Sequence, residues 1–346
     1  MVHKISTAID MFCGCGGLTV GLKRAGFKVL GAVDNDPQSV RVYKTNHPDV
    51  YVWEENIRFL RPDVLKRKFH LNKGDLGLLA GCPPCQGFST MRTLNGALEI
   101  DDARNELLLD FQRFVETLQP RAVMLENVPG LADDRRFKKF LRELGRLGYI
   151  GEHRILNAAD YGVPQRRRRL IYLAGFGFKI PFATPVRRKK TVRDAIDGLP
   201  KAGTSGDPIH DMPEHRTIKV MGIIRRILKD GGSRTDLPRN KQLGCHKRCD
   251  GFKDVYGRMA WDDVAPTITS GCFNPSKGRF LHPEEDRAIT MREAALLQGF
   301  PRRYRFATSN KIAVASMIGN ALPPPFIAAH GKQVLRALID IPSARG

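Results

Sequence analysis

One short segment of the sequence could form a covalent bond with a substrate. The residues Pro83 to Gln86 follow an apolar run, Leu76 to Ala80, which we interpret as a buried strand. A cysteine becomes a nucleophile when it is exposed and when its surroundings favour the thiolate. Cys85 lies in this loop, in a strongly basic chain. We therefore predict that Cys85 is a catalytic nucleophile.

The same segment allows two other interpretations. Cys82 and Cys85 have the spacing of a redox-active dithiol. They could also supply half of a zinc site, for which Cys245, His246 and Cys249 offer the other ligands. We favour the nucleophile and predict no metal site.

Charged and polar side chains stand beside other predicted strands. Glu126 follows the apolar run Ala122 to Leu125, and a buried carboxyl there could act as an acid or a hydrogen-bond donor. Gln165, Arg167 and Arg169 alternate ahead of another run, so the two arginines point to the same side. Their guanidinium groups could bind a base carbonyl, orient the carboxylate or stabilise negative charge. A surface acid and a solvated basic face are the alternatives.

The N-terminal region has the pattern of a nucleotide-binding βαβ unit. A strand from Ile5 to Asp10 leads into a glycine-rich turn, Cys13 to Gly17, and then a helix. A second strand, Phe27 to Val33, ends at Asp34. Glycines permit close approach of the backbone to a ligand, and an acid after the second strand can accept hydrogen bonds from ribose. The pattern favours an adenosine-bearing cofactor, and a packing turn beside an acidic loop is the alternative.

Composition indicates an intracellular protein with a polyanionic partner. The chain has 346 residues, and its 57 Lys and Arg against 36 Asp and Glu give a net charge of +21. Such an excess is typical of proteins that bind nucleic acid. Seven cysteines, an odd number with close pairs, do not resemble a secreted disulfide framework. We also expect neither a membrane-spanning helix nor a secretion signal.

Taken in order, the motifs resemble those of the C5-cytosine DNA methyltransferase family. The series is Asp10-x-Phe12-x-Gly14-x-Gly16-Gly17, Pro84-Cys85-Gln86, Glu126-Asn127-Val128, Gln165-x-Arg167-x-Arg169 and Gly319-Asn320-Ala321-Leu322-Pro323-Pro324. The stretches 258–269 and 292–301 also resemble late motifs of that family. The resemblance spans nearly the whole chain.

The resemblance implies that the cofactor is S-adenosyl-L-methionine. Asp34 would hold the ribose hydroxyls, where family members usually carry Glu, and Asn56 stands where the family commonly has Asp beside the adenine. The implied cofactor-binding residues are Asp10, Phe12, Gly14, Gly16, Gly17, Asp34, Asn35, Asn56, Ile57, Pro84, Leu107 and Asn320.

The resemblance also implies a mechanism. The target cytosine is flipped out of the duplex, since C5 is buried in the base stack. Cys85 then attacks C6, Glu126 bonds the N3 edge, and Arg169 holds O2 with Arg167 in support. The methyl group passes to C5, and loss of the C5 proton releases Cys85.

The implied partner is double-stranded DNA. The loop from Gly87 to about Asp102 would close over it, as lids do in many enzymes. Residues of about 187–257 offer side chains that suit base edges and phosphates. The predicted DNA-binding residues are Gln86, Ser89, Arg92, Gln165, Arg234, Arg239, Gln242, Lys247 and Arg248.

We expect an α/β fold, with a Rossmann-like methyltransferase domain on a mostly parallel sheet and a smaller, irregular target-recognition domain. The first would span 1–186 and be completed by a C-terminal helix in 312–346. The second would span 187–311, because the sequence turns basic and rich in Gly and Pro near Pro185.

Two other functions remain open. The tRNA-methylating branch of the family shares the Cys, Glu and Arg elements, and Gly271-Cys272-Phe273 resembles one of its motifs, although Asn274 replaces its Thr. A catalytically silent DNA-binding protein or repressor is the alternative outside enzymes. We expect a cytoplasmic monomer that methylates DNA, with a cognate restriction endonuclease as a possible partner.

Overall fold

The computed structural model describes residues 6–84, 106–238, 240, 242, 244 and 253–340. The chain divides into two compact units. Unit 1 comprises residues 1–161, 168–185 and 322–346, and unit 2 comprises residues 162–167 and 186–321. The C-terminal segment therefore belongs to the same unit as the N-terminal βαβ region.

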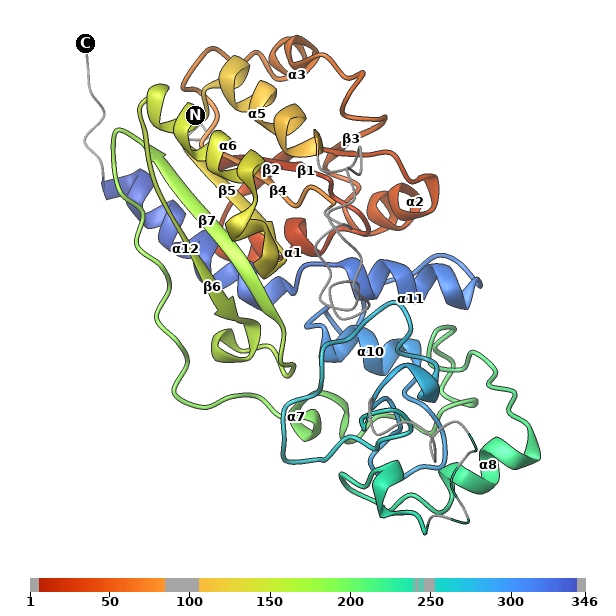
Figure 1. Ribbon diagram of the computed structural model, residues 1–346. Coiled ribbons are helices and arrows are strands. Elements are labelled where there is room, and N and C mark those ends of the chain that lie inside the picture. Colours follow the sequence, from red (N-terminus) through yellow and green to blue (C-terminus); the bar gives the residue numbers. More distant parts are fainter. Residues whose placement is uncertain are drawn as a thin grey trace. The chain divides into compact units, whose positions relative to one another are not determined.

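Unit 1 is built on a seven-stranded sheet with the order β3-β2-β1-β4-β5-β7-β6 (Figure 1). The first five strands in this order pair in parallel, and β7 is antiparallel to both of its neighbours. This arrangement confirms the predicted Rossmann-like α/β class with a mostly parallel sheet. The strands are β1 (Thr7–Met11), β2 (Lys28–Asp34), β3 (Tyr51–Glu54), β4 (Leu78–Gly81), β5 (Ala122–Asn127), β6 (Tyr149–Asn157) and β7 (Arg168–Phe176).

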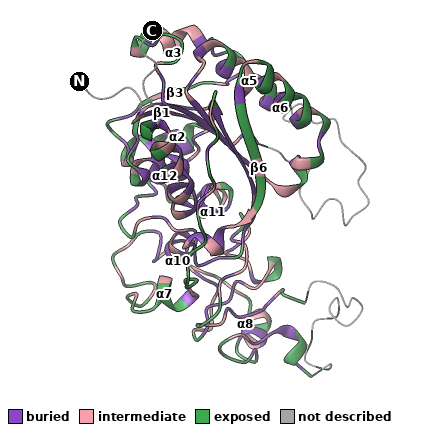
Figure 2. Cartoon of the chain, turned by 90° about the vertical axis from the view of Figure 1, so that its left-hand side faces the viewer, coloured by how far each residue is buried: buried purple, intermediate pink, exposed green. Residues whose placement is uncertain are grey.

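Helices cover both faces of this sheet, as Figures 1 and 2 show. Helices α5 and α6 lie on one face, and α1 and α12 pack together on the other. Every residue of β1, β4 and β5 is buried as a result. Strands buried on both faces appear as continuous apolar runs, which is why the sequence reveals them. The helices of unit 1 are α1 (Gly17–Ala25), α2 (Pro37–Asn46), α3 (Pro62–Phe69), α5 (Leu107–Leu118), α6 (Arg135–Arg146) and α12 (Pro324–Asp340), with 3₁₀ turns at Pro129–Asp133 and Ala158–Tyr161.

Unit 2 consists of short helices joined by irregular loops. The guanidinium group of the fully buried Arg258 donates hydrogen bonds to the backbone carbonyls of Ile224, Ile227, His282 and Glu285. A buried arginine that satisfies several loop carbonyls can replace the ladders of a sheet as a source of order. Its elements are α7 (Val192–Ile196), α8 (Ile218–Ile224), α10 (Met291–Leu297) and α11 (Lys311–Asn320), with 3₁₀ turns at Arg234–Asp236 and Pro275–Lys277.

One described segment, Lys311–Asp340, is long and apolar enough to cross a membrane by length and composition alone. The mean hydropathy of its most apolar window is 1.4, and 61% of that window is buried inside the protein. Core helices of water-soluble proteins pass the same test, so this segment is weak evidence for a membrane span.

The contact between α1 and α12 in unit 1 requires a residue without a side chain. A Cβ atom on Gly21 would lie 2.5 Å from Cβ of Ile327 and 2.9 Å from the carbonyl oxygen of Pro324. We predict that Gly21→Ala lowers the free energy of unfolding by about 1–3 kcal/mol, because extra atoms in a packed contact force the helices apart. Urea unfolding followed by circular dichroism measures this change.

Gly145→Ala is the matched control. Gly145 lies in α6, and a Cβ atom there would meet no atom within 4 Å. Alanine is favoured over glycine in a helix by about 0.8–1 kcal/mol, so this variant should be at least as stable as the original protein. Equal effects of the two substitutions would contradict the proposed role of the α1–α12 contact.

Candidate active site

The loop between β1 and α1 turns sharply through residues in the left-handed region. Phe12 has φ 65°, Gly14 has φ 51°, and Gly16, the residue before α1, has φ 100°. A Cβ atom on Gly14 would meet nothing within 4 Å, so backbone conformation rather than crowding favours glycine there. Gly17 is the first residue of α1. The loop thus presents backbone at the end of a central strand, where open α/β sheets bind ligands.

Asp34, the last residue of β2, holds this loop in place. Its Oδ2 accepts a hydrogen bond from the backbone N–H of Gly14 at 2.7 Å, and its Oδ1 accepts one from Asp36 N–H at 2.9 Å. Burial raises the pKa of the Asp34 carboxyl, although these hydrogen bonds oppose the shift. Asn35, which follows, is exposed. Since each carboxylate oxygen has a second lone pair, Asp34 can still accept hydrogen bonds from a ligand.

Asp10 supports the loop from within the protein. It is completely buried, and its Oδ2 accepts a hydrogen bond from the Thr19 hydroxyl at 2.7 Å. That hydroxyl lies 2.7 Å from the hydroxyl of Tyr43 on α2. The other oxygen, Oδ1, has no hydrogen-bond partner among the described residues. Burial raises the pKa of Asp10 to about 8, so its carboxyl is neutral at neutral pH.

Thr19 and Tyr43 were not among the residues predicted from sequence. A threonine on a helix and a tyrosine on the next helix carry no signal of a shared hydrogen bond until the fold brings them to Asp10. Asp10, one of the predicted cofactor-binding residues, is fully buried and bonds Thr19.

The turn after β3 is tied to α5, also within unit 1. Asn56 Oδ1 accepts a hydrogen bond from the backbone N–H of Arg58 at 3.1 Å, so its side chain shapes its own turn. Arg113 on α5 donates to the carbonyl oxygen of Ile57 at 2.7 Å. Leu107 is the first residue of α5 and is half-buried. Two of the predicted adenine contacts, Asn56 and Ile57, thus lie on a turn fixed by the helix that Leu107 begins.

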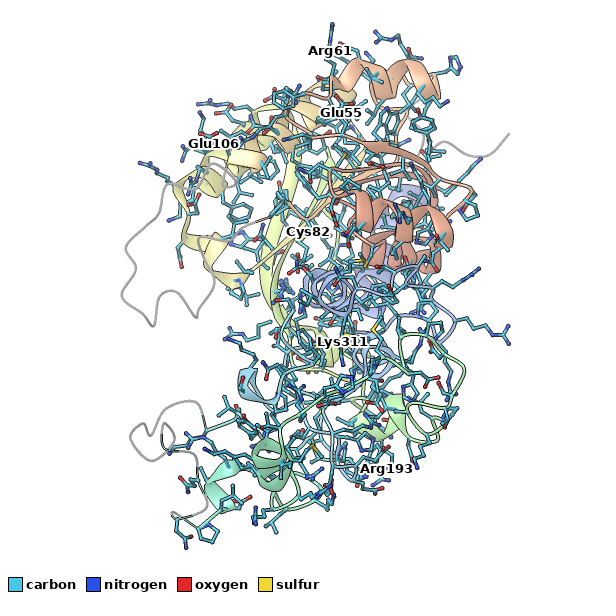
Figure 3. All side chains as sticks on the ribbon, turned by 90° about the vertical axis from the view of Figure 1, so that its right-hand side faces the viewer. Glu55, Arg61, Cys82, Glu106, Arg193 and Lys311 are labelled. Carbon is cyan, nitrogen blue, oxygen red and sulfur yellow. The ribbon has the colours of Figure 1, made fainter. Side chains whose placement is uncertain are left out.

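Glu126 is held at the end of β5 by groups from two other elements. Its side chain is 2% exposed. Arg169 on β7 places Nε 3.0 Å from Glu126 Oε1. The thiol of Cys82, labelled in Figure 3 just after β4, donates to Glu126 Oε2 at 2.8 Å. Asn127 Nδ2 donates to the carbonyl oxygen of Pro83 at 3.0 Å and so fixes the segment that continues to the exposed Pro84.

The predicted nucleophile, Cys85, follows Pro84 directly and lies outside the described residues. The predicted DNA-binding residues Gln86, Ser89, Arg92, Arg239, Lys247 and Arg248 also lie outside them, as do Cys245, His246 and Cys249. Among the residues that the structure describes, no group of three or more His, Cys, Asp and Glu side chains could hold a metal ion.

Arg167 and Gln165 lie in the interior of unit 2. Arg167 is 3% exposed and donates to the carbonyl oxygens of Ile268 at 3.0 Å and Gly319 at 2.8 Å. Gln165 is fully buried, and its amide bonds the Gln298 side chain at 2.6 Å and the backbone N–H of Ile268 at 2.7 Å. Gln165, predicted to contact DNA, thus has both ends of its side-chain amide bonded within unit 2.

The other described residues of unit 2 that were predicted to bind ligands make contacts of their own. Asn320 is exposed and donates to Ser316 Oγ at 3.3 Å. Gln242 donates to the carbonyl oxygen of Leu237 at 2.8 Å. Arg234 is 4% exposed, which removes most of its surface from a partner.

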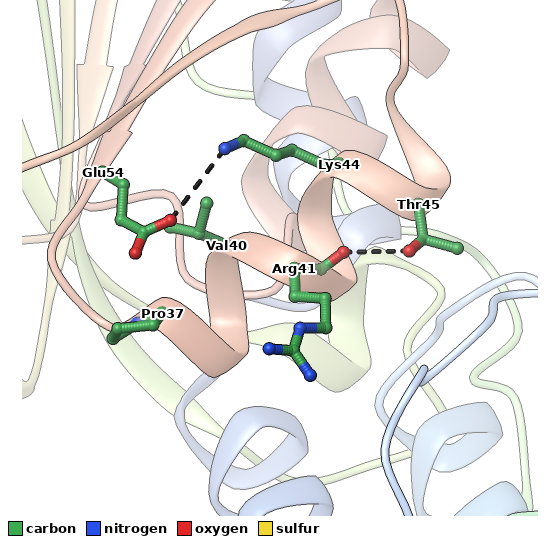
Figure 4. A pocket seen from close by; sticks show the side chains of 6 residues that line it. All are labelled: Pro37, Val40, Arg41, Lys44, Thr45 and Glu54. Atoms are coloured by element: carbon green, nitrogen blue, oxygen red, sulfur yellow. Dashed lines mark hydrogen bonds and ion pairs between the residues drawn. The ribbon is translucent and has the colours of Figure 1, made fainter.

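A separate pocket of about 500 Å³ lies on α2 and β3 (Figure 4). Lys44 and Glu54 face each other across it, with Nζ and Oε2 3.9 Å apart. None of the predicted cofactor-binding residues lines this pocket. It is therefore distinct from the loop that Asp34 holds.

Comparison with known proteins gives consistent matches along the chain. The profile of the family described as C-5 cytosine-specific DNA methylase matches residues 6–336. The Type II methylase M.HgiDII of Herpetosiphon aurantiacus is 36% identical, with 96% of each chain covered. The Type II methyltransferase M1.HphI of Haemophilus parahaemolyticus is 34% identical over 95% of this chain and 87% of its own.

Solved structures show the same fold. A DNA modification methyltransferase encoded within an E. coli prophage has a TM-score of 0.72 and 25% identity, with 97% of this chain and 99% of the other covered. The S. pombe Dnmt2 methyltransferase has a TM-score of 0.68 at 18% identity, with 96% and 99% covered, a likeness of fold alone.

The neutral form of Asp10 predicts a pH dependence of stability. Its pKa is about 8 in the folded protein and near its ordinary acidic value in the unfolded chain, so the folded state binds one more proton between those limits. The free energy of unfolding should then fall as pH rises from 5 to 8, by about 1.4 kcal/mol per pH unit from this group.

Asp10→Asn removes this titration and keeps an oxygen that can accept the Thr19 hydrogen bond. Thermal melts of both proteins at pH 5, 6, 7 and 8 should show the variant gaining stability relative to the original protein with each step. Parallel curves would mean that Asp10 is ionised in the folded state.

Proposed function

The chain belongs to the C-5 cytosine-specific DNA methylase family, and from this premise we propose how its residues methylate DNA. It is a DNA (cytosine-5)-methyltransferase with bacterial Type II relatives. The observation that carries the proposed mechanism is the buried Glu126 carboxylate, which Arg169 and Cys82 contact. Cys82 lies three residues before Cys85 in the sequence.

The chemistry first requires access to the base. Cytosine C5 lies within the base stack, so the target nucleotide has to be extruded from the duplex at a cost of a few kcal/mol. The net charge of +21 supplies attraction to the phosphates that helps to offset this cost. We propose that unit 2 recognises the target sequence and that unit 1 carries the reacting groups.

We infer that Cys85 activates the flipped base as a covalent nucleophile. Its thiolate forms a bond to C6, the C5–C6 electron pair shifts to form a C4–C5 double bond, and the C4–N3 pair takes up a proton from the Glu126 carboxyl. Glu126 is suited to this N3 edge because its carboxyl is oriented by partners on both oxygens. Arg169, which already pairs with Glu126, can hold O2 of the base and stabilise the developing charge.

The methyl group completes the cycle. S-adenosylmethionine, when bound, supplies a sulfonium methyl to C5 and leaves as S-adenosylhomocysteine. A solvent base then removes the C5 proton, the electron pair restores the C5–C6 double bond as the thiolate of Cys85 departs, and N3 returns its proton to Glu126. Arg167 has a different task within unit 2, where its guanidinium binds backbone carbonyls of Ile268 and Gly319.

The described residues fit this cofactor. The turn through Phe12, Gly14 and Gly16 presents backbone at the end of β1. Asp34 lies at the end of β2 with acceptor capacity left for ribose hydroxyls. This is the arrangement that the chemistry of an adenosine ligand requires. A monomer would suffice, because one flipped base needs one cleft, and a cognate restriction endonuclease is the partner that fits the Type II relatives.

The first prediction concerns the reaction itself. Expression of this chain in cells without other cytosine methylation should place 5-methylcytosine at one short sequence motif, and Cys85→Ala should abolish the mark. Bisulfite sequencing of the genomic DNA measures both. A mark that persists in Cys85→Ala would contradict the covalent mechanism, and methylated tRNA with unmodified DNA would contradict the substrate.

The second prediction concerns the cofactor. Asp34→Asn should weaken binding of S-adenosylmethionine by about 10-fold or more, because a hydrogen bond to a charged group contributes about 1.5–3 kcal/mol. Isothermal titration calorimetry measures the dissociation constant without DNA.

Asp36→Asn is the matched control for the loss of one charge. Asp36 caps α2 by accepting hydrogen bonds from Ser39, and asparagine is an equally good cap. Its affinity for S-adenosylmethionine should stay within about 2-fold of the original, a change of under 0.5 kcal/mol. Equal weakening in both variants would point to net charge rather than to a ribose contact at Asp34.

A further inference from the structure

Strand register places Cys82 beside Glu126. In the parallel pair β4–β5, Leu79 lies opposite Val123 and Gly81 opposite Leu125. Cys82 follows Gly81 directly after β4, and Glu126 follows Leu125 in β5. The Cys82 thiol donates a hydrogen bond to Glu126 Oε2 at 2.8 Å. The contact follows from the pairing of two central strands rather than from a flexible surface loop.

The backbone around Cys82 is fixed on both sides. Its N–H donates to the carbonyl oxygen of Met11 on β1 at 3.3 Å. The next carbonyl, that of Pro83, accepts a hydrogen bond from Asn127 Nδ2 at 3.0 Å. The position of the thiol is therefore set by β1 and β5 together, and it has little freedom to turn away from Glu126.

The two oxygens of Glu126 have different partners. Arg169 approaches Oε1 from β7, and Cys82 approaches Oε2 from the turn after β4. A carboxylate pinned at one oxygen can rotate about that contact, whereas a carboxylate pinned at both cannot. The ion pair and the hydrogen bond therefore act on different oxygens of the same carboxyl group.

We propose that Cys82 is a positioning residue for Glu126. Its thiol holds the carboxyl in the orientation that presents an oxygen to N3 of the flipped base. This inference rests on the proposed function of Glu126. It also gives Cys82 and Cys85 separate tasks, because the thiol of Cys82 is hydrogen-bonded to a carboxylate.

The first test is kinetic. Cys82→Ala should lower kcat by about 10-fold through loss of orientation and leave KM for DNA and S-adenosylmethionine within about 2-fold. Its pH profile should also change, because a hydrogen-bond donor to the Glu126 carboxyl is lost. Cys82→Ser retains a donor and should restore most of kcat. Cys272→Ala, which removes a buried thiol from unit 2, controls for loss of a cysteine.

A double-mutant cycle identifies the group through which Cys82 acts. If it acts through Glu126, then Cys82→Ala should cause no further loss in a Glu126→Gln background, measured by single-turnover methyl transfer. An undiminished loss in that background would overturn the proposal. So would an unchanged kcat and pH profile in Cys82→Ala, or failure of Cys82→Ser to restore activity.

The second test does not depend on methylation. In a Cys85→Ser protein, alkylation of Cys82 by iodoacetamide is followed against pH by peptide mass spectrometry. The Glu126 carboxylate disfavours the thiolate, so Glu126→Gln should shift the alkylation curve to lower pH. Identical curves would overturn the contact even if the enzyme is active. A shifted curve in a protein that does not methylate DNA would refute the proposed function and leave the contact standing.

Discussion

The buried Glu126 carboxylate near the end of β5 needs a cation beside it, and the direction of strand β7 supplies Arg169. Glu126 is 2% exposed, and removal of an ionised carboxyl from water without a partner costs several kcal/mol. Because β7 runs antiparallel to β5, its first residues lie beside the last residues of β5, with Leu170 opposite Asn127. Arg169 therefore reaches Glu126 from the start of its strand. A parallel strand would begin at the opposite edge of the sheet and could not supply it.

Arg167 and Arg169 look equivalent in the sequence, but they have different partners in the structure. Alternation predicted that Arg167 and Arg169 point to the same side. The chain passes from unit 2 to unit 1 between them, so Arg169 pairs with Glu126 while Arg167 binds the carbonyls of Ile268 and Gly319. One arginine pairs with a buried carboxylate of unit 1, and the other stabilises the loops of unit 2. Both remain essential in our proposal, for different physical reasons.

What the sequence could predict follows from burial. Strands covered on both faces, such as β1 and β5, form apolar runs that are visible without a structure, and motif spacing indicated Glu126 and Asp34. The edge strand β6 was not predicted, because most of its residues are exposed and its sequence is mixed. The neutral state of Asp10 and the contact of Cys82 also escaped prediction, since both depend on neighbours distant in sequence. The assignments of Cys85 and the loop after it rest on sequence alone.

Strand order also accounts for how two substrates can meet. The loop that Asp34 holds follows β1, Cys82 follows β4, and Glu126 is the next-to-last residue of β5. These three strands lie side by side in the sheet. Adjacent strands are about 4.8 Å apart, so the loop after β1 and the Glu126 carboxylate start from strands whose axes are roughly 10 Å apart. Met11, the last residue of β1 before this loop, links β1 to the segment after β4. Its carbonyl oxygen accepts a hydrogen bond from the backbone N–H of Cys82. One backbone hydrogen bond thus joins the end of β1, where this loop begins, to the residue whose thiol contacts Glu126.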